Sequence, residues 1–426
     1  MRTPTILIAL GGLLLGFSSC VKDKCERKVT YVKTTPIYLA PAEYRFADLD
    51  LSGARDLDQP GKIYFYNDFI FINEQREGVH IIDNANPLSP SNIGFLEIPG
   101  NVDIAIADQT LYADNYTDLL TIDISNINRP QLVKRSEDIF PHQGENNTGQ
   151  RLLYYDHEEI TEVVSCDDAD ALRQSTWGNV GVFNTDLNSP ISANGSSESS
   201  VGTGGSLARF TISNQHLYTV NEWQMQVFQI GADNCPNPVS TVDLGWGIET
   251  IFPHDNKLFI GSNSGMTIYS LADPSKPDYL SGYSHLTACD PVFVKDNYAY
   301  VTLRSGTLCN GSTLNQLDLI DISDIRNIEL VKSFPMDNPH GLSIRDNNLF
   351  LCEGEYGLKV FDIEAPLRLD ESQIEHLTGR AATDVIAIPD QRKLLLVIGE
   401  DGFYQYNFDD PKALQELSFI PVTGLR

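Results

Sequence analysis

Apolar residues in this chain occur in short runs, either alternating with polar residues or continuous, and turn-forming residues separate the runs. A period of two over about four to eight residues, bounded by Gly, Pro, Asn and Asp, is typical of β-strands, whereas an amphipathic helix repeats its apolar positions every three or four residues. The pattern therefore favours β-strands over helices throughout the chain.

Seven segments share one plan. Each has a short apolar strand, a second strand rich in Tyr and Leu, a tight polar turn, a third strand that ends in an acid, and a Pro-containing turn before a fourth strand. One segment reads DIAIADQTLYADNYTDLLTIDISNINRPQLVKRSED. Most steps between segments are about forty residues, as expected for four-stranded propeller blades. The first strands begin near Gly61, Asp103, Leu207, Thr250, Asp290, Gly341 and Asp384.

These repeats predict an all-β chain whose residues 61–426 form a seven-bladed β-propeller. A single repeat cannot bury its own apolar surface, whereas a closed ring covers both faces of every blade and protects the inner strand edges. No helices are needed to complete such a fold.

The third strands carry the phrases HIIDNANP, TIDISNINRP, LIDISDI and VFDIEAP. In these phrases the chain resembles the LVIVD-repeat β-propellers, and most of all the lipoproteins of Bacteroidetes-type bacteria that contain such repeats. The likeness extends from about Tyr31 onward and includes YVKTTPIYLAPAEYRF and NPHGL. It implies an extracytoplasmic propeller and implies no particular activity.

The two faces of the predicted ring differ in sequence. With strands A to D numbered from the centre outward, A–B and C–D turns share one face, and B–C turns and D–A connections share the other. The C–D turns are short, Pro-rich and repetitive, which indicates a structural role. The B–C turns are rich in acids and aromatic residues, and an insertion at about 142–206 emerges on their face. We expect binding residues there, because loops on a rigid scaffold usually carry them.

Within the insertion, RLLYYDHEEITEVVS is expected to form an added strand or hairpin, and NSPISANGSSESSVGTGGS is Ser/Gly-rich and expected to be flexible.

Asp103, Thr250, Asp290 and Asp384 occupy nearly the same phase at the entrance of strand A in their repeats. On a ring they would point at one mouth of the central channel. The carboxylates of Asp103, Asp290 and Asp384 can then coordinate a divalent cation such as Ca²⁺, or accept hydrogen bonds from a sugar or a cationic group. The alternative is that they accept backbone N–H bonds from adjacent blades and hold the ring together.

Four further residues join this rim by position. His340 precedes a strand A, and with Asp290 or Asp384 it is the candidate for acid–base catalysis. Trp246 and Glu249 lie in GWGIET, where a tryptophan beside acids suits stacking on a sugar ring or a cation. Arg380 lies in TGRAATD. No hydrolase elbow, zinc-protease motif, phosphate-binding loop or dinucleotide fingerprint accompanies them.

The N-terminal residues and the net charge limit the functional classes expected for this chain. Residues 1–19 have a cation, an apolar run and small residues before Cys20, which predicts a lipoprotein signal peptide with Cys20 lipidated. Residues 20–60 then supply a stalk and an N-terminal strand. The formal net charge of −28 disfavours nucleic acid as a partner. Export also permits disulfides, and Cys289 with Cys309 is the predicted pair, since both fall on the B–C side of repeat five.

These features predict a lipid-anchored binding or assembly scaffold of the cell envelope, placed at the outer membrane. Its acidic, insertion-bearing face and channel mouth would engage an envelope protein, a glycan or a cation. The alternative function is a propeller hydrolase or lyase that acts on polysaccharide at the same channel mouth.

Overall fold

The computed structural model describes residues 26–46, 49, 51–142, 144–165, 203–206, 208–284, 291–305 and 314–423. The chain divides into two compact units, one made of Met1–Pro36 with Tyr155–Phe183 and the other of Ile37–Tyr154 with Asn184–Arg426. The predicted lipidation site at Cys20 lies outside the described residues, as do Cys289, Cys309 and Asp290.

In the first unit the described residues belong to two strands, β1 (Glu26–Leu39) and β11 (Arg151–Ser165), which pair as a two-stranded sheet. β11 has the sequence RLLYYDHEEITEVVS, so the strand predicted within the insertion is confirmed. Its pairing with the N-terminal segment was not predicted.

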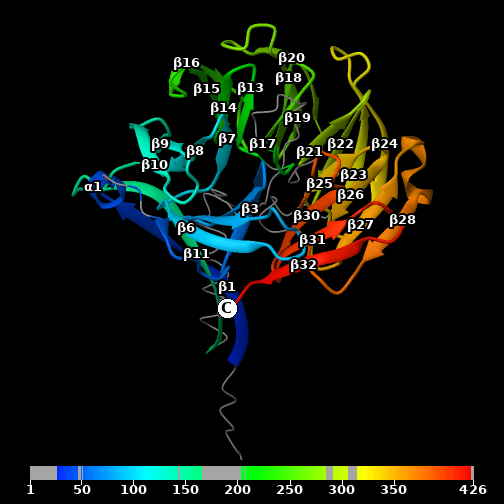
Figure 1. Ribbon diagram of the computed structural model, residues 1–426, viewed down its shortest axis with the longest axis horizontal. Helices are drawn as coiled ribbons and strands as arrows, with labels where there is room; N and C mark the ends of the chain where they lie inside the picture. The colour runs from blue at the N-terminus through cyan, green and yellow to red at the C-terminus, as the bar shows by residue number, and fades with distance from the viewer. Residues whose placement is uncertain are drawn as a thin grey trace, which may run out of the picture. The chain divides into compact units, whose positions relative to one another are not determined.

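The second unit is a ring of seven blades, each a four-stranded antiparallel sheet (Figure 1). Blade 1 contains β3 (Pro60–Tyr66), β4 (Phe69–Glu74), β5 (Gly78–Asp83) and β6 (Ser91–Glu97); blade 2 contains β7 (Ile104–Ala107), β8 (Thr110–Asn115), β9 (Asp118–Asp123) and β10 (Gln131–Ser136); blade 3 contains β13 (Phe210–Ser213), β14 (His216–Val220), β15 (Gln224–Ile230) and β16 (Pro236–Asp243); blade 4 contains β17 (Ile248–His254), β18 (Lys257–Ser262), β19 (Gly265–Ser270) and β20 (Asp278–Ser284). Blade 5 contains β21 (Val292–Lys295), β22 (Tyr298–Leu303), β23 (Gln316–Asp321) and β24 (Glu329–Pro335); blade 6 contains β25 (Leu342–Arg345), β26 (Asn348–Cys352), β27 (Leu358–Asp362) and β28 (Gln373–Leu377); blade 7 contains β29 (Asp384–Ala387), β30 (Leu394–Gly399), β31 (Gly402–Asn407) and β32 (Gln415–Pro421).

The first strand of each blade lies innermost. Around the ring β7 contacts β13, β13 contacts β17, β17 contacts β21, β21 contacts β25 and β25 contacts β29. The predicted seven-bladed propeller is therefore confirmed, and the predicted repeat starts lie at or beside the observed first strands. We call the face with the A–B and C–D turns the A–B face, and the face with the B–C turns and D–A connections the B–C face.

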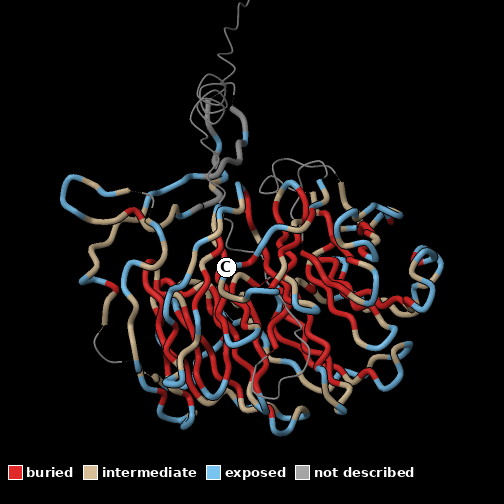
Figure 2. Tube along the Cα trace, turned by 90° about the horizontal axis from the view of Figure 1, so that it is seen from above, coloured by how far each residue is buried: buried red, intermediate tan, exposed pale blue. Residues whose placement is uncertain are grey.

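The core consists of apolar clusters that lie between neighbouring blades. One cluster joins Phe71 and Val79 of blade 1 to Leu111 and Leu120 of blade 2, and similar clusters join the other blades. Figure 2 shows buried residues along the strands and exposed residues at the turns. Each blade thus depends on its neighbours for the burial of its apolar surface.

The acid that ends the third strand in four of the blades has a local structural role. Asp83, Asp123, Asp321 and Asp362 each accept, through Oδ1, the backbone N–H two residues later, at 2.7–3.0 Å. These are Asx turns, which direct the chain into the C–D turn. The repeated acid is therefore explained by turn formation.

Two buried tyrosines each connect their own blade to the following one. Tyr112 of blade 2 donates its hydroxyl to the carbonyl of Asn234 in blade 3, and Tyr218 of blade 3 donates to the carbonyl of Pro274 in blade 4, both at 2.8 Å. Since both acceptors lie in C–D turns, these turns hold the blades together. The structural role expected for them is supported by these contacts.

Blades 7 and 1 close the ring. An apolar cluster that includes Ile386 and Leu396 of blade 7 and Ile70 and Ile72 of blade 1 fills the seam. Within it the side-chain amides of Asn84 and Gln405 exchange two hydrogen bonds of 2.9 and 2.8 Å, and both residues are fully buried. At the edge, Leu57 and Val422 form a parallel bridge.

Blade 1 has two additional short strands. β2 (Leu51–Ser52) pairs with the outer strand β6, and β12 (Thr203–Gly204), from the end of the insertion, pairs with the inner strand β3. The helices α1 (Pro41–Tyr44) and η1 (Pro366–Glu371) are short. Among the described residues no helix is long and apolar enough to cross a membrane.

We predict that Gln405→Leu lowers the free energy of unfolding by about 1–3 kcal/mol, because the Asn84 amide then stays buried without its partner. Asn84→Leu combined with Gln405→Leu should recover part of this loss. Urea denaturation of the two single variants and the double variant measures the coupling. Fully additive losses would contradict a direct interaction across the seam.

Candidate functional site

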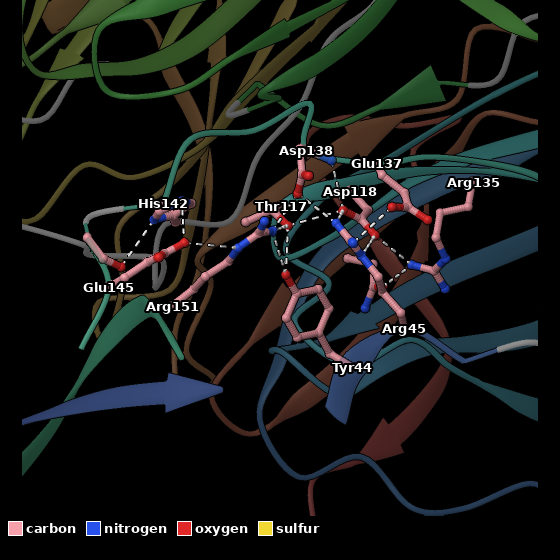
Figure 3. A network of polar contacts seen from close by, with 12 residues as sticks. Tyr44, Arg45, Thr117, Asp118, Arg135, Glu137, Asp138, His142, Glu145 and Arg151 are labelled. Carbon is pink, nitrogen blue, oxygen red and sulfur yellow. Dashed lines mark hydrogen bonds and ion pairs between the residues drawn. The ribbon is translucent and has the colours of Figure 1, made fainter. Parts of the chain in front are cut away.

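Tyr44 and Arg45 are held on the B–C face of blade 2 by a network of ion pairs and hydrogen bonds (Figure 3). Arg45 donates two hydrogen bonds to Asp118, at 2.8 and 2.9 Å, and one to Asp138 at 2.6 Å. Arg135 reaches the same Asp118 at 3.1 Å. Although burial favours the protonated acid, the bonds from the two arginines hold the pKa of Asp118 below its ordinary value.

The same network includes the first residues of the insertion. Arg151 donates to the hydroxyls of Tyr44 at 3.2 Å and Thr117 at 3.3 Å and forms an ion pair with Asp138. The Tyr44 and Thr117 hydroxyls are 2.9 Å apart. Because these charged groups are already paired with one another, the network acts as a clamp that fixes Tyr44, Arg45 and Arg151 on blade 2.

Asp103 connects three blades at the entrance of the channel. Its Oδ1 accepts the N–H of Ile104 at 2.8 Å, and its Oδ2 accepts the N–H groups of Arg209 at 2.6 Å and Phe210 at 3.0 Å, at the start of blade 3. Lys62 of blade 1 approaches the same Oδ2 at 3.0 Å. Asp103 therefore makes the contacts expected if this acid holds the ring together, which was the alternative to ligand binding.

Lys62 and Asp114 complete a buried charged group around Asp103. Burial lowers the pKa of Lys62 to about 8, against the opposing effect of Asp103, and burial raises the pKa of Asp114 to about 6. Asp114 Oδ1 accepts the N–H groups of Val102 and Asp103 at 2.8 and 2.9 Å. The sequence analysis missed both residues; the available signal was a lysine inside the apolar strand GKIYFY.

The end of the insertion crosses the channel on its B–C side. Gly204 pairs with Tyr64 of blade 1, and Ser206 Oγ accepts the N–H of Leu342 in blade 6 at 2.9 Å. The Ala208 carbonyl then accepts the N–H of Ile251 in blade 4 at 2.7 Å. Contacts to blades on several sides of the ring show that this segment occupies the predicted channel mouth.

Two other residues predicted at this mouth, Thr250 and Asp384, are buried. Thr250 is 1% exposed and Asp384 is fully buried. A Cβ atom at Gly341 would lie 2.4 Å from Asp384 Oδ1, so the close packing there requires glycine. Asp290 lies outside the described residues, so the proposed set of three carboxylates stays a prediction. Within the described ranges, no group of three or more His, Cys, Asp or Glu residues could hold a metal ion.

His340 is largely shielded from water. Burial, with a smaller contribution from the charge of Arg304, lowers the pKa of His340 to about 3. Its backbone carbonyl accepts the hydroxyl of Thr302 at 2.9 Å. At neutral pH the imidazole is uncharged and, with this pKa, a weak general base.

Trp246 lies on the surface beside a second tryptophan, Trp223. Each is 42% exposed, and their ring centroids are 4.2 Å apart with a tilt of 53°. Trp223 comes from the B–C turn of blade 3 and Trp246 from the following D–A connection, so both lie on the B–C face. Glu249 lies at the start of the next strand, β17. The sequence singled out Trp246 and missed Trp223, whose B–C turn NEWQ was the available signal.

Arg380 lies at the seam of blades 6 and 7. Its guanidinium pairs with Glu416 at 3.2 Å and lies 4.3 Å from the ring centre of Phe419 and 4.9 Å from that of Tyr404. It lines a pocket of about 210 Å³ between the two blades. Arg380 is therefore distant in the ring from the pair of tryptophans in blades 3 and 4.

The predicted disulfide between Cys289 and Cys309 falls on residues that the structure does not describe. Cys235 and Cys352, for which the sequence indicated no partner, are free and buried. Burial, reinforced by Asp384, raises the pKa of the Cys352 thiol well above its ordinary value, so it is not a reactive thiolate.

Comparison with known proteins supports the fold. No protein-family model matches the chain, and no curated protein is detectably similar to it in sequence. A solved protein from Lactobacillus plantarum is 14% identical, with a TM-score of 0.52 over 86% of this chain and 97% of that one. The periplasmic gluconolactonase of Pseudomonas aeruginosa is 11% identical, with a TM-score of 0.51 over 85% and 96%. Such likeness shows a shared propeller scaffold.

We predict that His340 contributes to acid destabilisation of the fold. Its pKa in the folded state lies below the value of about 6.5 in the unfolded chain, so unfolding takes up a proton between about pH 6.5 and 3. The free energy of unfolding therefore falls as the pH drops through this window. His340→Gln should reduce this slope by up to one proton in urea denaturation series. A pH-independent difference between variant and wild type would contradict the prediction.

Proposed function

We propose that this chain is a lipid-anchored, extracytoplasmic binding scaffold of the LVIVD-repeat kind, whose B–C face engages a basic envelope protein. The repeated third-strand phrases and the signal-like N-terminus support the anchoring and the location at the outer membrane. The exposed pair Trp223 and Trp246 is the observation that carries the binding function.

The backbone around Trp246 favours display of its ring. Gly245 and Gly247 have φ values of +90° and +76°, a region that other residues rarely adopt. A Cβ atom at Gly247 would lie 2.3 Å from the side chain of Asn263. On the other loop, Asn221 accepts the N–H groups of Trp223 and Gln224, both at 2.9 Å. Specific turns on both loops therefore present two large aromatic rings side by side to solvent.

The charges around the pair favour a cationic partner. Glu222 precedes Trp223, and Asp243 and Glu249 flank Trp246 at three residues on either side; neither loop, 221–224 or 243–250, contains Lys or Arg. Burial raises the pKa of Glu222, against the opposing charge of the nearby Arg209, as expected for a partly desolvated carboxyl next to the tryptophan. Tryptophan faces attract Lys and Arg side chains, and the net charge of −28 attracts basic proteins over distance.

The catalytic alternative has less support. A polysaccharide hydrolase or lyase at the channel mouth would need His340 as an acid or base. The pKa of about 3 makes its imidazole a weak base at neutral pH, and Ser206 joins the insertion to blade 6 immediately beside it, at Leu342. The geometry therefore favours binding over catalysis on the B–C face.

We predict that Trp223→Ala with Trp246→Ala weakens partner binding by about tenfold or more, as expected when exposed aromatic anchors are truncated. Envelope extract would be passed over immobilised wild type and variant, and any protein retained in stoichiometric amount would be purified and titrated against both. Its affinity should also fall as the salt concentration rises.

Tyr279→Ala is the matched control, because Tyr279 is an exposed aromatic residue on the outer strand of blade 4, 59% accessible. This variant should bind like wild type. Equal binding by the tryptophan variant and the control, or binding that does not depend on salt, would reject the proposed surface.

A separate prediction concerns the anchor. Cys20→Ser should move the protein from the membrane fraction to the soluble extracytoplasmic fraction, because the lipid is expected on the Cys20 thiol. Fractionation after metabolic labelling with a fatty acid measures this. A labelled Cys20→Ser protein, or an unlabelled wild type, would contradict lipidation at this residue.

A further inference from the structure

A large cavity opens on the A–B face, which the sequence analysis assigned a structural role. Its volume is about 1190 Å³. Its walls come from the first strands of blades 1 and 3 and from β12, and its rim comes from A–B turns of blades 1, 2, 3, 4 and 7 and the C–D turn of blade 3. This volume is in the range of clefts that hold small molecules.

The described end of the insertion contributes to this cavity. Thr203 and Gly204 line it and pair with Phe65 and Tyr64 of blade 1. Ser206 and Ala208 continue across the B–C side of the channel through their bonds to blades 6 and 4. A ligand would therefore enter from the A–B face and meet the crossing segment at the inner end.

The inner wall combines apolar surface with hydroxyl groups. Phe65 and Phe210 line it with the small accessible part of each ring, 6% and 4%, and Arg392 lies over the Phe65 ring. Tyr64 and Thr211 are the hydroxyl-bearing residues of this wall, and the Tyr64 hydroxyl also bonds to the backbone of Ile106. Burial lowers the pKa of His254, so this residue is uncharged at neutral pH. An ion moved from water against such a wall would lose its hydration without gaining a compensating charge there. The interior therefore suits an uncharged ligand with both apolar faces and hydroxyl groups.

The charged residues of the rim are mainly acidic, and most of these acids form ion pairs. Arg392 bonds to Asp390 at 2.6 Å and to Asp68 at 2.9 Å, and Asp255 pairs with Lys257. Asp108 adds a further acid. The remaining negative charge repels anions such as phosphates and carboxylates. The carboxylate oxygens can still accept hydrogen bonds from hydroxyl groups.

We propose that this cavity is a binding site for a neutral oligosaccharide. A pyranose ring has an apolar face that packs on aromatic side chains and hydroxyl groups that bond to acids, amides and hydroxyls. The wall and rim offer these partners in one pocket. The site lies on the face opposite the two tryptophans and is independent of the proposed protein partner.

The test uses a variant that blocks the opening. Ala232 is exposed in the C–D turn of blade 3 and lines the cavity, whereas Ala272 is exposed at the equivalent position of blade 4 and does not line it. Saturation-transfer NMR and calorimetry would be run with the neutral tetrasaccharides cellotetraose, maltotetraose, mannotetraose and chitotetraose, and with spermidine and gluconate as charged probes.

We expect at least one neutral tetrasaccharide to bind saturably, Ala232→Trp to weaken it by tenfold or more, and Ala272→Trp to leave it within twofold of wild type. Trp223→Ala with Trp246→Ala should also leave it unchanged. The proposal is overturned if none of the four binds, if only spermidine or gluconate binds, or if binding survives Ala232→Trp while the tryptophan variant loses it.

Discussion

Each blade of this protein exposes apolar surface on both sides of its sheet, and only a neighbouring blade can cover it. This constraint is met at every seam by interdigitated apolar residues, and at the last seam it must be met by segments more than three hundred residues apart. In the part of the chain that the structure describes, blades 7 and 1 share no strand. The seam is held by the apolar cluster, the reciprocal amide pair of Asn84 and Gln405, and the bridge between Leu57 and Val422.

The same constraint divides the turns into two kinds. Several C–D turns begin with Asx turns, and those of blades 3 and 4 accept a tyrosine hydroxyl from the preceding blade, so their sequence is tied to ring assembly. Several B–C turns lack this role in ring assembly and can present residues such as Trp223 to solvent. The turn of blade 2 is an exception, because Asp118 beside it anchors Arg45 and Arg135.

The insertion between blades 2 and 3 connects distant parts of the molecule. Its beginning enters the clamp through Arg151, and its end crosses the channel from blade 1 to blades 6 and 4. The crossing places Arg209 and Phe210 where Asp103 accepts their N–H groups, with Lys62 as counter-ion. Burial of this ion pair is costly unless the remaining polar atoms are also bonded, and the backbone donors meet that need for the carboxylate of Asp103. The described end of the insertion thereby crosses the channel on the B–C side, and the large cavity opens on the other face.

The sequence by itself determined the blade count, the strand order within each blade, the acid of the Asx turn and the face on which the insertion emerges, because all of these depend on short-range periodicity and local turn chemistry. The sequence also identified Trp246 as a candidate binding residue, from the composition of the segment GWGIET. Only the tertiary structure decided that Trp223 is its neighbour, that Asp103 is bonded to blade 3 and Lys62, that Thr203–Gly204 joins the inner edge of blade 1, and that the large cavity opens on the A–B face. Those features arise where residues from different blades meet, and a linear pattern repeated in every blade does not specify which copies come together.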